Sequence, residues 1–352
     1  MIDAWTASPD RYSARAEQWF RACGSAGMPL PAISLGMWHN FGAPGSDSGR
    51  RDETALHANA TAMMQSAFDR GVVHFDLANN YGPPPGSAEE RVGRILRQHF
   101  DTHRDELVIS TKAGYQMFDG PYQDGGSRKY VLDSSAASLR RLGLDHVDIF
   151  YHHRPDPTVP LEETMGALDH LVRVGDARYV GLSNYSAEQL SAALAVCERE
   201  GFARPVIHQC PYSALDRAFG SGALPVGADA GLGAIVFSPL AQGLLTDKYI
   251  DAIPDDSRAS TESVFLGTGR ITPELQDALR SVRAIAQDRG QSVAQLALSW
   301  VLADDRISSA LIGAGRVGQV EECCDVLVAD PLAADERDAI TEVFSSAVTS
   351  GR

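Results

Sequence analysis

Eight short apolar segments recur along the chain, and amphipathic patterns separate them. The segments are Ile33–Trp38, Val73–Leu77, Leu107–Ala113, Val147–His152, Tyr179–Ser183, Val206–Cys210, Ala234–Ser238 and Ser308–Ile312. Each is almost continuously apolar, which is typical of parallel strands that are covered on their outer face. Eight strand–helix units in 352 residues predict an α/β protein with a (β/α)8 TIM barrel fold in a single domain.

The remaining segments are assigned around this barrel. The single domain is expected to span residues 1–352, with residues 1–30 as an N-terminal extension packed on the barrel. The interval before the eighth strand holds a loop at residues 240–271 and two expected helices, Thr272–Arg289 and Ser292–Ala303. Because long loops in compact domains are commonly functional, we expect residues 240–271 to cover a cofactor.

Composition excludes several classes of partner and site. The net charge of −15 argues against nucleic acid and against an anionic membrane surface as partners, although a local basic pocket for a phosphate is compatible with it. Five cysteines without a CxxC pair predict reduced thiols and no metal site. We see neither a signal peptide nor an apolar run long enough to span a bilayer, so a cytoplasmic protein is expected.

Four polar residues lie at or near the ends of three successive apolar segments. Asp76 and Lys112 lie toward the ends of the second and third segments, Tyr81 follows Asp76 by five residues, and His153 directly follows the fourth segment. Taken singly, Asp76 could cap a helix, Lys112 could be solvated and Tyr81 could pack in a loop. Since the carboxyl ends of parallel barrel strands form the active-site rim, the four together predict an active site.

Proton delivery to a carbonyl oxygen is the chemistry that these four residues favour. A tyrosine hydroxyl has an ordinary pKa near 10, and the ammonium of Lys112 is expected to lower the pKa of Tyr81. Asp76 would keep the lysine charged, and His153 would donate to the substrate oxygen or relay the proton. The carbonyl carbon then needs a hydride, which indicates a nicotinamide cofactor.

The sequence around these residues resembles the aldo-keto reductases from about Leu35 to Asp325. The matching stretches are Phe75-Asp-Leu-Ala-Asn-Asn-Tyr-Gly82, Ser110-Thr-Lys-Ala113, Asp148-Ile-Phe-Tyr-His-His-Arg154, Gly181-Leu-Ser-Asn184, Gln209 and Phe237-Ser-Pro-Leu-Ala-Gln-Gly243. The stretches 79–90, 125–130 and 239–246 are similar to the branch that holds bacterial L-glyceraldehyde 3-phosphate reductases and potassium-channel β subunits. The resemblance implies that Tyr81 is the general acid/base, that Asp76 and Lys112 tune it, and that His153 rather than His152 orients the carbonyl.

A glycine motif after the eighth segment points to a phosphate site. Gly313-Ala-Gly-Arg-Val-Gly318 fits the G-x-G-x-x-G dinucleotide pattern, but the chain ends at Arg352, too soon for a Rossmann sheet. After the eighth strand, TIM barrels bind phosphate at a helix N-terminus. The nearby cations Lys248, Arg258 and Arg316 indicate a phosphate-rich ligand and favour NADP over NAD.

The resemblance implies an NADP(H) site along the rim. Ser183, Asn184 and Gln209 would hold the carboxamide, and Phe237 would stack on the nicotinamide unless it is a core aromatic residue. Trp38 is expected to form a wall of the substrate pocket rather than a cofactor contact, although it is counted in the set below. The whole predicted set is Trp38, Asp76, Ser183, Asn184, Gln209, Phe237, Ser238, Pro239, Leu240, Gln242, Gly243, Lys248, Arg258, Gly313, Gly315, Arg316, Gln319 and Glu322. Cys323 replaces an asparagine of the family at the adenine end.

Two functions from different classes remain open. The first is reduction of small aldehydes and ketones such as L-glyceraldehyde 3-phosphate or methylglyoxal, with Arg128, Lys129 and Arg154 either receiving a substrate phosphate or acting as structural charges. The second is an NADP(H)-binding regulatory subunit that turns over slowly. Channel-associated members of the family typically carry Asn at the position of His153, so the histidine favours a working reductase. The resemblance also suggests a homo-oligomer.

Overall fold

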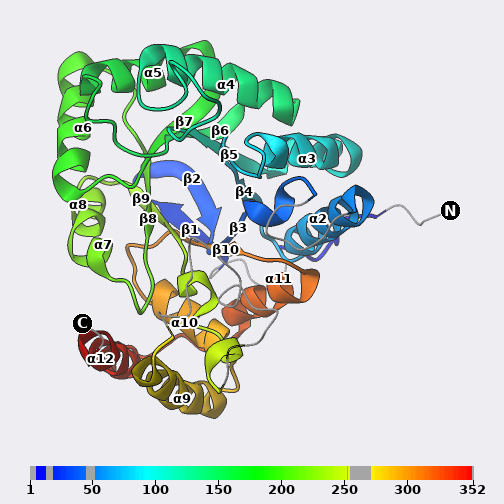
Figure 1. Ribbon diagram of the computed structural model, residues 1–352, viewed down its shortest axis with the longest axis vertical. Coiled ribbons are helices and arrows are strands. Elements are labelled where there is room, and N and C mark those ends of the chain that lie inside the picture. The colour runs from blue at the N-terminus through cyan, green and yellow to red at the C-terminus, as the bar shows by residue number, and fades with distance from the viewer. Residues whose placement is uncertain (1–4, 13–18, 45–51, 252, 254–270, 351–352) are drawn as a thin grey trace.

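The computed structural model describes residues 5–12, 19–44, 52–251, 253 and 271–350. Within them, eight parallel strands form a closed barrel, in which neighbouring strands follow the order β10-β3-β4-β5-β6-β7-β8-β9 (Figure 1). Their bounds are β3 (Ile33–Gly36), β4 (His74–Asp76), β5 (Val108–Ala113), β6 (Val147–His152), β7 (Ala177–Ser183), β8 (Ile207–Pro211), β9 (Gly233–Phe237) and β10 (Ser309–Gly313).

The barrel confirms the predicted fold class, and its strands begin and end close to the predicted residues. The parallel register pairs Phe75 of β4 with Ile109 of β5, and Lys112 of β5 with Tyr151 of β6. The strands are therefore aligned at their carboxyl ends, and Asp76 and Lys112 reach the same rim. Continuous apolar strands could be located because both of their faces are covered.

Helices surround the barrel and connect successive strands (Figure 1). The capping boxes Ser186/Gln189 and Ser292/Gln295 fix two helix starts, because each serine accepts from an N3 amide that would otherwise lack a partner. The helices are α2 (Glu53–Asp69), α3 (Ser87–Ile95), α4 (Arg128–Leu142), α5 (Leu161–Val174), α6 (Ala187–Glu200), α7 (Ala218–Ser221), α8 (Ala223–Asp229), α9 (Pro273–Asp288), α10 (Val293–Leu302), α11 (Val317–Cys324) and α12 (Ala334–Ser350).

Short helical turns complete the chain. They are η1 (His39–Phe41), η2 (Leu96–Phe100), η3 (Asp101–Glu106), η4 (Ala241–Gly243), η5 (Asp247–Tyr249) and η7 (Asp325–Val328). The long segment predicted at residues 240–271 begins with η4 and η5, and residues 252 and 254–270 lie outside the described residues. Residues 45–51, which include most of the glycine-rich stretch Gly42–Gly49, also lie outside the described residues. Among the described helices, none combines the length and the apolar character needed to cross a membrane.

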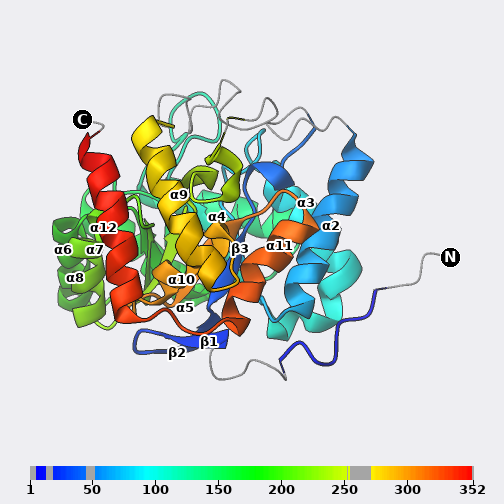
Figure 2. The same ribbon diagram turned by 90° about the horizontal axis from the view of Figure 1, so that it is seen from below.

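An antiparallel hairpin covers the amino-terminal end of the barrel. It comprises β1 (Phe20–Cys23) and β2 (Ala26–Pro31), and Figure 2 shows it below the barrel. Its residues Cys23, Met28 and Leu30 pack with the barrel residues Ile149, Tyr151, Ile207, Ile235 and Leu311 in one buried cluster. Burying side chains of this size stabilises the fold by about 1.5–3 kcal/mol each, so the hairpin is an apolar plug opposite the active-site rim.

Candidate active site

A buried ion pair lies at the carboxyl ends of β4 and β5. The Lys112 Nζ lies 2.5 Å from Asp76 Oδ2 and also donates to the Leu77 carbonyl at 2.6 Å, and both charged side chains are fully buried. Desolvation lowers the pKa of Lys112, and the charge of Asp76 opposes that shift. Asp76 therefore caps no helix and Lys112 is not solvated: each side chain has the other as its partner.

Tyr81 lies beside this pair in the turn that follows β4. The Lys112 Nζ lies 5.1 Å from the centre of the Tyr81 ring. Desolvation raises the pKa of Tyr81 well above 10, and Asp76 and Tyr115 raise it further. The pKa of Tyr81 is thus shifted in the direction opposite to our prediction, because desolvation favours the neutral phenol and the negative charge of Asp76 adds to that effect. The phenol therefore keeps its proton at neutral pH.

His153 is the histidine that adjoins Tyr81. The ring centres of His153 and Tyr81 lie 5.9 Å apart, and Tyr115 contacts His153 edge-on at 4.6 Å. Desolvation lowers the pKa of His153 well below 6.5, and the charge of Lys112 adds to the effect, so the imidazole is neutral. Its Nδ1 is buried without a hydrogen-bond partner among the described residues.

His152 lies on the opposite side of the strand. Its Nδ1 is 2.6 Å from the Tyr185 hydroxyl and its Nε2 is 3.3 Å from the Gly125 carbonyl. Desolvation lowers the pKa of His152 to about 4. It is a buried structural residue that ties the loop before α4 to the barrel.

The residues predicted for the carboxamide surround the ion pair. Gln209 Nε2 donates to Asp76 Oδ1 at 3.2 Å, so this amide is in contact with the predicted catalytic group. Asn184 Nδ2 donates to the His153 carbonyl at 3.0 Å and to Ser183 Oγ at 3.1 Å. Amide and hydroxyl groups from β7 and β8 thus gather beside Asp76 and His153.

Two aromatic residues flank the same region. The Trp38 ring lies 6.2 Å from the Tyr81 ring, which is consistent with a pocket wall. Phe237 ends β9, is half-buried and packs against the apolar cluster that contains Ile235 and Leu311.

The segment after β9 has an unusual backbone. Ser238, Ala241 and Gln242 adopt left-handed conformations with φ of 54°, 48° and 61°, which side chains other than glycine seldom adopt and which concentrate at functional sites. Gln242 Nε2 donates to Ser238 Oγ at 2.8 Å. Together with Pro239, Leu240 and Gly243, these residues form a tight turn in which Ala241 N donates to the Ser238 carbonyl and Gly243 N to the Leu240 carbonyl.

The glycine motif after β10 forms a loop that leads into α11. Gly315 N donates to Gln319 Oε1 at 2.8 Å, and Ser292 Oγ donates to Glu322 Oε1 at 2.7 Å. Gly313 and Arg316 are exposed, and no described atom would contact a Cβ at Gly313. Asn40 and Asn59, which the sequence analysis missed, donate to the Ala314 and Gly315 carbonyls. Two asparagines from outside the motif therefore fix its conformation.

Of the three cations predicted for the adenosine end, Lys248 and Arg316 lie in the described part of the chain. Lys248 in η5 is exposed, with its Nζ 6.0 Å from the Tyr249 ring. Arg258 lies outside the described residues. Cys323 is buried in the core beneath α11, so its side chain takes no part in the exposed surface of this helix.

A chain of polar side chains inside the barrel was also missed. Ser309 Oγ lies 2.6 Å from Ser34 Oγ, Ser34 Oγ lies 2.9 Å from His74 Nδ1, and His74 Nε2 lies 2.9 Å from Ser110 Oγ, which donates to Asp76 Oδ1 at 2.6 Å. His74 and Ser110 precede Asp76 and Lys112 by two positions, so strand alternation points each pair to the same face. That spacing was a readable signal.

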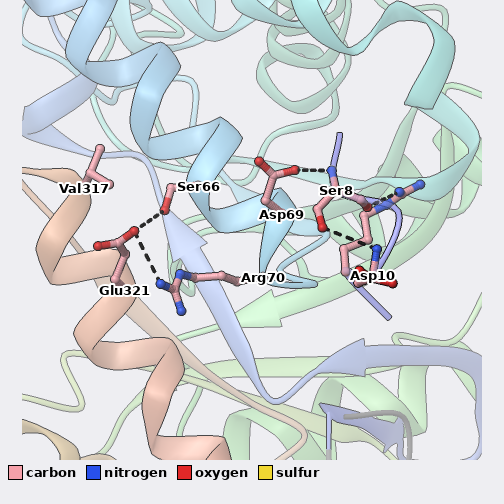
Figure 3. Close-up of a pocket in the computed structure, with 8 residues that line it drawn as sticks. Ser8, Asp10, Ser66, Asp69, Arg70, Val317 and Glu321 are labelled. Carbon is pink, nitrogen blue, oxygen red and sulfur yellow. Dashed lines mark hydrogen bonds and ion pairs between the residues drawn. The ribbon is translucent and has the colours of Figure 1, made fainter. Parts of the chain in front are cut away.

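A surface cavity between the N-terminal segment, α2 and α11 is a different place. The cavity is lined by Ser8, Asp10, Arg11, Ser66, Asp69, Arg70, Val317 and Glu321, and Figure 3 labels each of these except Arg11. The polar groups there pair with one another: Ser8 N donates to Asp69 at 2.7 Å and Arg70 lies 3.4 Å from Glu321. Asp69 and Arg70 are at the carboxyl end of α2, which runs back toward the amino-terminal side of the barrel. The cavity is therefore remote from the rim.

Comparison with known proteins agrees with this geometry. The model of the aldo/keto reductase family matches residues 32–344. The chain is 50% identical over 326 residues to an L-glyceraldehyde 3-phosphate reductase of Escherichia coli (strain K12), which covers 90% of this chain and 89% of that protein. It is 36% identical over 311 residues to a putative voltage-gated potassium channel subunit beta of Schizosaccharomyces pombe, with 86% of each chain covered.

Proposed function

The chain belongs to the aldo/keto reductase family, and from that premise we propose that it is an NADPH-dependent reductase of small aldehydes and ketones. The observation that carries the proposal is the buried Asp76–Lys112 pair next to Tyr81, with the His153 ring also beside the tyrosine. A general acid, a positive charge near it and a neutral histidine together suit protonation of a carbonyl oxygen.

Each of these residues has a part in the proposed reaction. Tyr81 is held as a protonated phenol by its raised pKa, and it donates that proton to the carbonyl oxygen. Lys112, 5.1 Å from the ring, stabilises the phenolate that forms as the proton leaves. The neutral imidazole of His153 orients the carbonyl oxygen. A reduced nicotinamide bound at the rim supplies the hydride for the carbonyl carbon.

The described residues fit a nicotinamide dinucleotide. Ser183, Asn184 and Gln209 are suited to a carboxamide, and the half-buried ring of Phe237 is suited to stacking. The left-handed turn at 238–243 and the loop into α11 suit the phosphates. The exposed cations Lys248 and Arg316 favour NADP over NAD.

A phosphorylated aldehyde is the substrate class that we propose. The E. coli relative is named for L-glyceraldehyde 3-phosphate, and the position of Arg154 supports the same substrate class for this chain. Its guanidinium lies 4.8 Å from the Tyr115 ring, which in turn contacts His153. All three cations have partners: Arg128 donates to the Gly166 carbonyl, Lys129 pairs with Asp133, and Arg154 pairs with Asp124 at 2.7 Å. Arg154 suits a substrate phosphate because it lies beside Tyr115 and His153, and the phosphate would compete with Asp124 for its guanidinium.

The proposal is tested by NADPH oxidation with a panel of carbonyl compounds. We expect turnover with small aldehydes, a higher kcat/KM for glyceraldehyde 3-phosphate than for glyceraldehyde, and a higher kcat/KM with NADPH than with NADH. Tyr81→Phe should lower kcat by about 10²- to 10⁴-fold, the usual range for a general acid. Tyr12→Phe removes a hydroxyl that bonds Glu106 away from the rim and should leave kcat unchanged. Unaltered turnover in Tyr81→Phe would refute the proposal.

A second function is favoured by the channel-subunit relatives. In that case the chain would bind NADP(H), turn over slowly and act on a partner protein. A single-turnover rate above roughly 1 s⁻¹, the low end for ordinary enzymes, would favour the reductase. A homo-oligomeric state and a cytoplasmic location stay predictions, and light scattering after size exclusion would test the first.

A further inference from the structure

A chain of hydrogen bonds inside the barrel links Ser309, through Ser34, His74 and Ser110, to Asp76. All of its hydrogen bonds run in one direction, because each hydroxyl group has one hydrogen to donate. Asp76 accepts from Lys112 at 2.5 Å as the carboxylate of the ion pair, so the Ser110 hydroxyl must donate to it. A hydroxyl has one hydrogen. Ser110 therefore has none left for His74 and must accept from His74 Nε2.

The same count continues through the histidine. Desolvation lowers the pKa of His74 to about 4, with Asp76 opposing the shift and Lys112 adding to it, so the imidazole is neutral at neutral pH. A neutral imidazole with its hydrogen on Nε2 accepts at Nδ1. Ser34 must then donate to Nδ1 and accept from Ser309. Every hydrogen bond of the chain is thus oriented toward the Asp76 carboxylate.

The chain does not lead a proton to solvent. Ser309, Ser34, His74 and Ser110 are all fully buried. The hairpin plug with Cys23, Met28 and Leu30 closes the barrel beneath them. The chain therefore acts on Asp76 by its polarity, since oriented donors in a low-dielectric interior strengthen one another.

We propose that His74 is a positioning residue: through Ser110 it holds Asp76 as the charged partner of Lys112, the pair that adjoins Tyr81. The catalytic part of this inference rests on the proposed function. The ionisable groups that interact with the pair include His74, Tyr81, Tyr151, His153 and the buried Glu89, and Gln209 adds a neutral donor. Without the chain, the negative charge of Asp76 is less dispersed and acts more strongly on Tyr81, which raises the pKa of the phenol and makes it a weaker acid.

Four variants test the proposal in single-turnover experiments with NADPH. His74→Leu and Ser110→Ala should each lower the rate about tenfold, the equivalent of one pKa unit, while KM for the carbonyl and Kd for NADPH stay within about twofold. His74→Gln keeps a donor and an acceptor and should recover most of the rate. His208→Leu is the matched control, because His208 is also a buried strand histidine but neither ring nitrogen has a partner among the described residues.

Two results would overturn the proposal. One is a rate within twofold of wild type in Ser110→Ala, the variant least able to disturb folding. The other is an equal loss in His208→Leu and His74→Leu, which would show a general effect of removing a buried histidine.

A spectroscopic measurement keeps this proposal separate from the proposed function. Nitrogen-15 spectra of histidine-labelled protein should show His74 as the Nε2–H tautomer and without titration between pH 5 and 9. Titration within that range, or the Nδ1–H tautomer, refutes the oriented chain even if the protein is an active reductase. If the spectra show the Nε2–H tautomer without titration but no carbonyl compound is reduced, the proposed function is refuted and the oriented hydrogen-bond chain is not.

Discussion

Lys112 places a positive charge in a barrel interior that solvent does not reach. Among the described residues, Lys112→Met would leave the Asp76 carboxylate with Ser110 and Gln209 as its side-chain donors. Removing one partner of a buried ion pair typically costs about 3–5 kcal/mol. We therefore expect the free energy of unfolding, measured with urea at pH 7, to fall by about that amount, and carbonyl reduction to be lost.

The double variant Asp76→Asn/Lys112→Met separates the two effects. An asparagine carries no charge, so it can remain buried without the lysine. We expect the double variant to recover more than half of the lost stability and none of the activity. If the losses in unfolding free energy of the two single variants simply add in the double variant, the view that the two charges act chiefly by pairing with each other is contradicted.

The identity of the candidate site residues could be predicted from the sequence, but not every property of their side chains. Asp76, Lys112 and His153 stood out because each is ionisable and closes an apolar strand. Tyr81 was predicted, but the direction of its pKa shift was not. That direction depends on how completely the fold excludes water and on the pairing of Lys112 with Asp76, which the order of residues does not reveal.

At the scale of elements, one buried arginine joins α3 to the turn that follows β3. Arg91 donates to the Phe41 carbonyl at 3.0 Å and to the Gly42 carbonyl at 2.8 Å, and pairs with Glu53 at 2.7 Å. In Arg91→Met, two buried carbonyls lose their donor, which costs about 1–3 kcal/mol each. We expect faster amide hydrogen exchange around η1 and a higher KM for the carbonyl, because η1 adjoins Trp38.

Arg94→Met is the control for this prediction. Arg94 pairs with the same Glu53 at 2.7 Å, but its side chain is 46% exposed. Exposed ion pairs contribute about 0–1 kcal/mol, so exchange and KM should change little. Equal effects from both variants would assign the role to Glu53 rather than to the carbonyl contacts of Arg91.

The elements that could not be predicted lack a local pattern. The strand Phe20–Cys23 is short and includes an arginine, and its partner Ala26–Pro31 contains a glycine and two prolines. They form a hairpin because the open end of a barrel needs an apolar cover. The spacing that points His74 and Ser110 to the face of Asp76 and Lys112 was readable, but the connection of these residues through Ser34 to Ser309 forms only when the barrel closes.

At the scale of the whole molecule, Asp304 joins the last helix to the barrel. Its buried carboxylate accepts from Arg306 after α10, from Arg337 of α12 and from Tyr212 after β8, at 2.7, 3.2 and 3.2 Å. Desolvation raises the pKa of Asp304, but hydrogen bonds and charges from Arg306 and Arg337 outweigh it and lower the value to about 2. Segments distant in the sequence thus depend on one ionised side chain.

The stabilisation by Asp304 should depend on pH in a defined direction. The pKa of Asp304 is lower in the folded chain than its ordinary value of 3.8, so the stabilisation is complete above pH 4 and disappears as the pH falls toward 2. Because the arginines are 34% and 28% exposed, screening limits it to about 1–2 kcal/mol. Urea unfolding of Asp304→Asn should show this loss at pH 7 and a smaller loss at pH 3. Asp338→Asn removes an exposed carboxylate from α12 and should match wild type at both pH values. A constant difference between Asp304→Asn and wild type would mean that packing of α12, rather than the charge, holds this helix on the barrel.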